Sequence, residues 1–176
     1  MKPQLTLFFL FIIITSRAQS FTTVTMAGIG EIKVGMKKAD LEKLIGTPIK
    51  LKNLLKKESD RDTVLCTYKD IPMQVVLDKN FTADNLSEIV VWEVKSSSPQ
   101  LKTKSGIGMG EDKLKIITTY EGYIIFLMPE YENNYTVKSK TKSTVTLRGD
   151  ESGNVIIFYL TNNKVTAISV TYEEGC

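Results

Sequence analysis

The sequence contains no histidine among its 176 residues. This absence excludes Ser-His and Cys-His nucleophilic catalysis, proton transfer by imidazole and the usual zinc ligand sets. Pairs of acidic residues such as Glu130 with Glu132 could in principle supply acid–base chemistry, but exposed carboxylates are the default. We therefore expect no catalytic residue and a protein that is not an enzyme.

Cysteine is scarce as well, with Cys66 and Cys176 the two examples. In an oxidising compartment an even number of cysteines permits a disulfide. Spacing in the sequence does not show whether the two Cα atoms come close enough to be bridged. The alternative is that Cys66 is a small core residue and Cys176 a thiol at a frayed end, and the sequence leaves both interpretations open.

Metal-binding motifs are also lacking. The stretch from Asp78 to Ile89 has oxygen-bearing side chains at alternate positions, as a calcium loop has. An EF-hand requires Gly at the sixth position and Glu at the twelfth, whereas Ala83 and Ile89 stand there. We interpret this stretch as a hairpin loop and expect neither a metal ion nor a cofactor.

The longest apolar run is Leu5–Ile14, which is too short to span a bilayer. It follows Lys2 and precedes a small-residue cleavage pattern, as in a secretory signal peptide. We predict a signal peptide over residues 1–18, with cleavage after Ala18 or alternatively after Ser20. No cysteine follows the run closely, so we expect no lipid anchor and a protein that is secreted or periplasmic.

Neither sign of charge dominates, with 23 basic and 20 acidic residues. Removal of Lys2 and Arg17 with the signal peptide would bring the two numbers still closer. Binding to nucleic acid or to an anionic membrane usually shows as a strong positive excess. We therefore expect neither of these partners.

One pattern occurs twice. Ile29–Pro48 has a glycine turn, then apolar residues at helical spacing, then Gly-Thr-Pro, which ends a helix. Gly106–Gly122 repeats this pattern loosely. The spacing predicts helices over about 37–45 and 111–120, and a second short helix within 49–62.

Strand-like segments follow each copy of the helix. They are rich in β-branched residues or alternate between apolar and polar side chains. A polar stretch, 130–142, is typical of a loop or a projecting hairpin. The expected strands are 21–26, 63–69, 73–77, 88–94, 123–128, 143–148, 155–160 and 164–172.

The order of these elements indicates an internal duplication. We predict an α+β fold of two similar units, residues 19–95 and 106–176, joined by the polar linker 96–105. Each unit would pack one or two helices on a three- to four-stranded antiparallel meander.

The run from Val34-Gly35-Met36 to Gly46-Thr47-Pro48, followed by strands, resembles the SmpA/OmlA family. Those proteins are small lipoproteins of the outer-membrane β-barrel assembly machinery. Tandem duplication of such a unit resembles the β-lactamase inhibitory protein type, in which two repeats form one concave sheet that grips an enzyme. The chain lacks the lipoprotein cysteine and has no cysteine pair in each repeat, so no functional residue is carried over. The resemblance implies an exported protein-binding module of the cell envelope, or an inhibitor of a hydrolase.

Alternation along two predicted strands defines a candidate binding face. Ile89 and Val91 would share one face of the strand 88–94, and Phe158 and Leu160 one face of the strand 155–160. The opposite faces carry Trp and Tyr, which are typical of protein-binding surfaces. If helices cover the first face, the second lines an open surface, although a sheet buried on both faces would show the same pattern. The candidate binding residues are Val90, Trp92, Val94, Ile157 and Tyr159.

Two other functions stay open at this stage. A carboxylate-dependent hydrolase of envelope polymer would require acidic residues that converge in a pocket. A binder of a small apolar ligand would require a cavity between the sheet and the helices.

Overall fold

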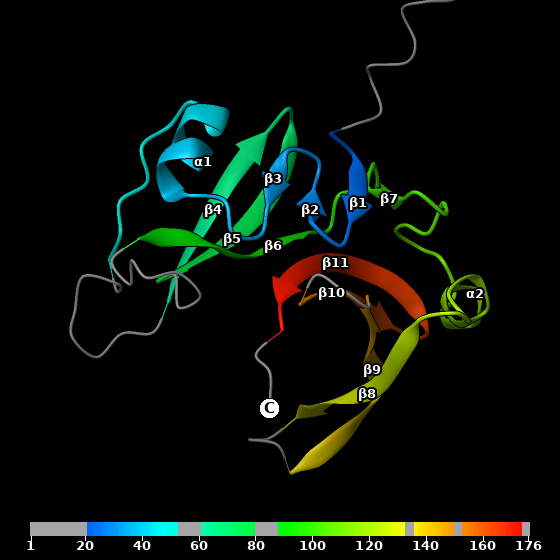
Figure 1. Ribbon diagram of the computed structural model, residues 1–176. Helices are drawn as coiled ribbons and strands as arrows, with labels where there is room; N and C mark the ends of the chain where they lie inside the picture. Colours follow the sequence, from blue (N-terminus) through cyan, green and yellow to red (C-terminus); the bar gives the residue numbers. More distant parts are fainter. Residues whose placement is uncertain (1–20, 53–60, 80–87, 133–135, 150–152, 174–176) are drawn as a thin grey trace, which may run out of the picture.

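The computed structural model describes residues 21–52, 61–79, 88–132, 136–149 and 153–173. The expected signal peptide and Cys176 lie outside these ranges. The predicted α+β class is wrong, because the described residues are mostly β and form a seven-stranded and a four-stranded sheet (Figure 1). The helices are short, with eight and seven residues. Two strands extend into the polar stretch 130–142, for which the sequence pattern predicts a loop or a projecting hairpin.

Two antiparallel meanders make up the large sheet. β4, β5 and β6 form the first, and β8, β9, β10 and β11 form the second. They meet where β6 pairs with β11, so the two expected units share one continuous sheet. The strand order across the sheet is β4 (Asp62–Tyr68), β5 (Ile71–Lys79), β6 (Ile89–Ser96), β11 (Lys164–Tyr172), β10 (Asn154–Thr161), β9 (Val137–Arg148) and β8 (Ile124–Glu132).

Two-residue turns close two of the hairpins. Lys69 and Asp70 link β4 to β5, and Asn162 and Asn163 link β10 to β11. All four have positive φ, between 48° and 63°. Turns with two left-handed residues match the twist of antiparallel strands, and Asn and Asp tolerate that conformation better than most residues. The Asn162-Asn163 pair therefore forms a tight hairpin between β10 and β11.

The small sheet ties the start of the chain to its middle. Its strand order is β3 (Ile32–Lys33), β2 (Gly28–Ile29), β1 (Thr23–Thr25) and β7 (Lys102–Thr103), and β1 and β7 run parallel. β7 lies inside the expected linker 96–105, and the adjacent Leu101 is fully buried. Gly28 allows the close approach of β3, because a Cβ there would lie 2.1 Å from the Ile32 carbonyl oxygen.

Two helices flank the sheets. α1 (Lys38–Ile45) ends at Gly46, whose φ is 69° and whose N–H donates to the Glu42 carbonyl oxygen at 2.9 Å. α2 (Lys113–Thr119) begins at Asp112, whose side chain accepts a hydrogen bond from the Leu114 N–H at 2.9 Å. Both helices lie within a residue or two of the predicted ranges. Of the third predicted helix, residues 49–52 are not helical, 53–60 lie outside the described ranges, and β4 begins at Asp62.

A single core lies on one face of the large sheet, which we call the covered face. α1, α2 and the small sheet pack on it through apolar side chains such as Leu41, Ile116 and Ile32, all of them fully buried (Figure 1). The register aligns a row of aliphatic residues on this face across all seven strands. The row consists of Val64, Val75, Val94, Val170, Ile156, Leu147 and Ile125.

Truncation in this core should be costly. Phe158 is fully buried in β10, with its ring centroid 6.4 Å from that of Tyr120. We expect Phe158→Ala to lower the free energy of unfolding by about 3–5 kcal/mol, because it removes burial and leaves a cavity. Leu65→Ala is the matched control, since Leu65 is 81% exposed, and it should change stability by less than about 0.5 kcal/mol. Urea denaturation measures both, and similar values for the two variants would contradict this core.

Candidate functional site: the open face of the large sheet

The face of the large sheet that points away from the helices is the candidate site, and we call it the open face. Two adjacent rows of side chains cross it, each running over all seven strands. Except for the buried Ser169 and Val155, their members are exposed or half-buried. The first row is Leu65, Gln74, Lys95, Ser169, Ile157, Thr146 and Phe126, and the second is Thr63, Val76, Glu93, Thr171, Val155, Arg148 and Ile124.

The structure places three of the five candidate residues on this face. Ile157 and Tyr159 lie on it in β10, half-buried. Trp92 of β6 is also half-buried, and its ring reaches the same side, where it meets Arg61, the partner of Asp78 on this face. Val90 points to this side but is buried, with 7% of its surface exposed.

Val94 lies on the other face, so its predicted exposure is wrong. It is fully buried between Val75 and Val170 in the aliphatic row of the covered face. The cause is a β-bulge, because Val76 pairs with Glu93 while Leu77 pairs with Val91. Trp92 is the extra residue of that bulge, and one extra residue reverses the alternation that follows it.

Trp92 is held between Arg61, which directly precedes β4, and Tyr172 of β11. The Tyr172 ring meets it edge-on, with 5.2 Å between centroids and 65° between planes. The Arg61 guanidinium lies 4.1 Å from the centroid of the indole ring. Arg61 is itself fixed by an ion pair with the buried Asp78, at 2.8 Å between Nε and Oδ2. Stacking of this kind holds the indole in one orientation.

Tyr159 forms a second cluster two strands away. The Lys95 ammonium lies 3.4 Å from its ring centroid, and the Ser169 hydroxyl donates to its phenol oxygen at 3.5 Å. Burial raises the pKa of the Tyr159 phenol, and the negative charges of Glu93 and Glu130 raise it further, against an opposing effect of the Ser169 hydrogen bond. The phenol therefore stays neutral at physiological pH and can both donate and accept a hydrogen bond.

A third pair of an aromatic ring and a basic side chain lies near the β8 edge of the open face. The Arg148 guanidinium lies 5.2 Å from the ring centroid of Phe126 and forms an ion pair with Glu173. The open face thus carries three aromatic side chains, each with a basic group over its ring. Acidic groups lie beside these bases, so the face has no large excess of either charge.

Sequence reasoning missed most of these partners. Lys95 and Arg148 lie on different strands from the rings that they contact, and Arg61 directly precedes β4. No spacing in the sequence indicates such pairs. For Arg148 a signal existed, because alternation along 143–148 puts it on the face opposite the buried Val145 and Leu147.

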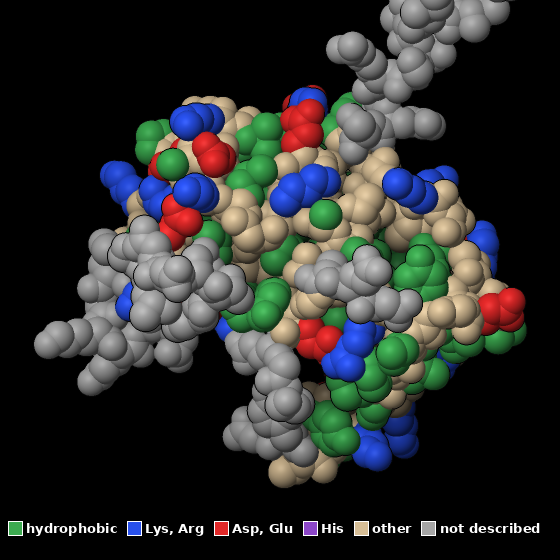
Figure 2. Space-filling view, viewed as in Figure 1, with side chains coloured by type: hydrophobic (Ala, Val, Ile, Leu, Met, Phe, Trp, Pro, Cys, Tyr) green, Lys and Arg blue, Asp and Glu red, His purple; other side chains and the backbone are tan. Residues whose placement is uncertain are grey.

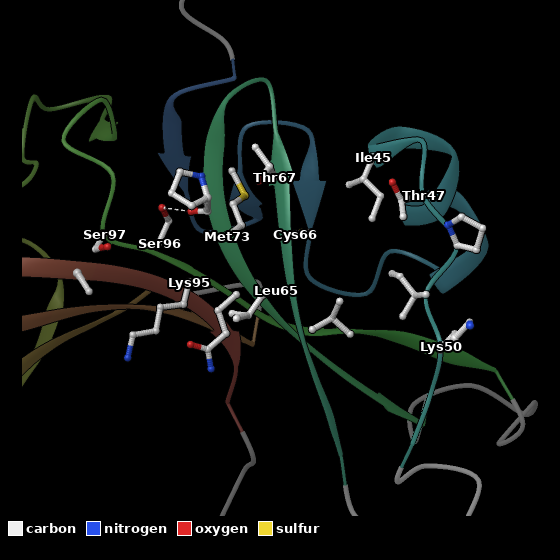
Figure 3. A pocket seen from close by; sticks show the side chains of 16 residues that line it. Ile45, Thr47, Lys50, Leu65, Cys66, Thr67, Met73, Lys95, Ser96 and Ser97 are labelled. Atoms are coloured by element: carbon white, nitrogen blue, oxygen red, sulfur yellow. Dashed lines mark hydrogen bonds between the residues drawn. The ribbon is translucent and has the colours of Figure 1, made fainter.

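A hollow of about 730 Å³ opens beside the edge strand β4 (Figure 3). Ile45, Cys66 and the chain after α1 line it on one side of β4, and Leu65, Gln74 and Lys95 line it on the other. Its charged side chains are Lys50 and Lys95, and its lining includes no carboxylate. Burial raises the pKa of the Cys66 thiol, which disfavours the reactive thiolate. The proposed disulfide partner, Cys176, lies outside the described residues.

No family model, curated protein or solved structure matches this chain. Within the described ranges, the structure has no helix with the length and apolar character needed to cross a membrane.

The contact between Arg61 and Trp92 can be tested by fluorescence, because the sequence has a single tryptophan. We expect Arg61→Ala to shift its emission to longer wavelength, since water would replace the guanidinium over the indole. The same change should lower the free energy of unfolding by about 2 kcal/mol, because the buried Asp78 loses this charged partner. Lys69→Ala is the control, since Lys69 lies over the Tyr68 ring instead. Identical emission spectra for the Arg61 variant and the parent protein would contradict the contact.

The environment of Tyr159 can be tested by titration. Because its pKa is raised above the ordinary value of 10.0, the unfolded phenol loses its proton first as the pH increases. The resulting stabilisation is complete below pH 10 and declines as the pH rises toward the pKa of the folded state. We expect Tyr159→Phe to reduce this decline and to remove a late phenolate step from the ultraviolet titration of the folded protein. If Tyr159→Phe instead removed a phenolate step with a pKa at or below the ordinary value of 10.0, the result would contradict the buried environment.

Proposed function

We propose that this chain is an exported, non-catalytic module that binds a protein partner on the open face of its large sheet. The observation that supports this proposal is the arrangement of Trp92, Tyr159 and Phe126, each oriented by a basic side chain on one uninterrupted face. Rings that are held in place before binding lose little conformational entropy when a partner covers them.

The size and chemistry of the face favour a protein over a small molecule. Seven strands at about 4.8 Å spacing make a surface about 30 Å across, which is comparable to one side of a standard protein interface. Trp, Tyr and Arg are the residues that most often contribute large shares of binding energy at such interfaces. Basic and acidic side chains alternate around the rings, which suits the mixed charge of a folded protein surface.

The nature of the partner follows from the resemblance and from the expected signal peptide. An exported module of this type would meet its partner in the periplasm or outside the cell. A hydrolase is the class of partner that the resemblance implies, and the open face would inhibit it by covering its substrate cleft.

Two alternatives receive less support. A carboxylate-dependent hydrolase needs converging acids, but the hollow beside β4 is lined by no carboxylate. Within the described ranges no three acidic or cysteine side chains cluster either. A small apolar ligand would need an enclosed cavity, whereas the hollow beside β4 is bordered by two lysines and reaches both sides of an edge strand.

A capture experiment identifies the partner, and variants of the open face test how it is bound. The purified, tagged protein is crosslinked in an extract of the host's envelope and culture medium, and the captured protein is then purified for affinity measurements. We expect Trp92→Ala and Tyr159→Ala each to weaken binding by at least about tenfold, as truncation of a central aromatic does at a hot spot.

Leu114→Ala serves as the control, because Leu114 is an apolar residue of α2 that is 65% exposed and remote from the open face. Thermal unfolding confirms that each variant is folded before its affinity is measured. Unchanged affinity in both folded open-face variants would refute the proposal.

A further inference from the structure

The apolar edge strand β8 forms the second exposed surface of this protein. β8 is the last strand of the large sheet, and no other strand in the described ranges pairs with its outer edge. Ile124, Leu127 and Met128 are 50%, 52% and 57% exposed, and Phe126 is 41% exposed. Figure 2 shows hydrophobic side chains gathered over the β8–β9 hairpin. These side chains alternate between the two faces of the strand, and they are exposed on both.

Such an edge is unusual for a protein that acts as a monomer. Natural sheets usually protect an edge strand with charges, with a bulge or with a covering segment, because a free edge pairs with other chains. β8 has no charge between Ile124 and Met128, and its pairing with β9 is regular over that stretch. We propose that β8 pairs with β8 of a second copy, so that two copies form one fourteen-stranded antiparallel sheet.

Pro129 indicates which backbone groups would make the new bonds. A proline is tolerated in an edge strand where its missing N–H would have pointed outward. In an antiparallel strand the N–H and C=O groups of alternate residues point to the same side. The groups of Ile125 and Leu127 therefore also point outward, and they are the ones available to a partner strand.

These outward groups select one register. When two antiparallel copies are centred on Phe126, Ile125 of each lies opposite Leu127 of the other, and every outward N–H finds an acceptor. A register centred on Leu127 would instead set Ile125 against Pro129 and lose a hydrogen bond at each end. The chosen register also places Ile124 opposite Met128 and Phe126 opposite its own copy, so apolar side chains meet throughout.

The exposed area is large enough for association. The exposed apolar side chains of the hairpin present on the order of 600 Å² per copy, close to the share of each partner in a standard interface.

Sedimentation equilibrium of the purified protein tests the proposal, and we expect a dimer at micromolar concentration. Leu127→Glu should raise the dimer dissociation constant at least about tenfold, because each copy would bury an unpaired charge. Leu65→Glu is the matched control, since Leu65 is an exposed leucine on β4 at the opposite edge of the sheet, and it should leave the constant unchanged. Circular dichroism confirms that both variants fold.

Cysteine crosslinking tests the register. Phe126→Cys should form a disulfide between copies under mild oxidation, because directly opposed residues of this kind have Cα atoms about 4.5 Å apart. Met128→Cys should not, since its sulfur would face Ile124 of the partner copy. Peptide mapping separates these bonds from any formed by Cys66 or Cys176.

Three results would overturn the inference. These are a monomer at every concentration tested, a dimer that Leu127→Glu leaves intact, and failure of the Phe126→Cys variant to crosslink within the dimer. Binding of the protein to anionic lipid vesicles that is lost in Leu127→Glu, without any dimer in solution, would assign the strand to a membrane surface instead. None of these results bears on partner binding by Trp92 and Tyr159.

Discussion

The pairing of β6 with β11 is the contact on which the remaining architecture depends. Four residue pairs join the two meanders there, and Val94 opposite Val170 lies at the middle of the aliphatic row. Without this contact, β6 and β11 would each have an unpaired edge. Neither helix would then have a sheet wide enough to pack on. With it, the covered face becomes one core and the opposite side becomes one uninterrupted surface.

Local patterns were sufficient to predict the two helices and most of the strands. The glycine after Ile45 and the acidic residue before Lys113 mark helix ends by mechanisms that operate within a few residues. The fold class could not be found this way, because β9 contains Lys138, Lys140 and Lys142 and is exposed on both faces near its start. A strand without a buried face shows no apolar alternation, so its sequence does not distinguish a loop from a projecting hairpin.

The candidate site was predictable only where alternation is regular. Ile157 and Tyr159 share a face because β10 pairs without interruption between Val155 and Tyr159. On β6 the bulge at Trp92 reverses the pattern, and nothing in the local sequence marks the position of that extra residue. The basic partners of the rings depend on which strands become neighbours, and that information lies in pairings between distant segments.

The parallel pairing of β1 with β7 imposes an order on the formation of the fold. One edge of β1 pairs locally with β2, but its other edge pairs Val24 with Thr103, which is made only after more than half of the sequence. The closure of so long a loop is entropically costly and makes this contact a late one.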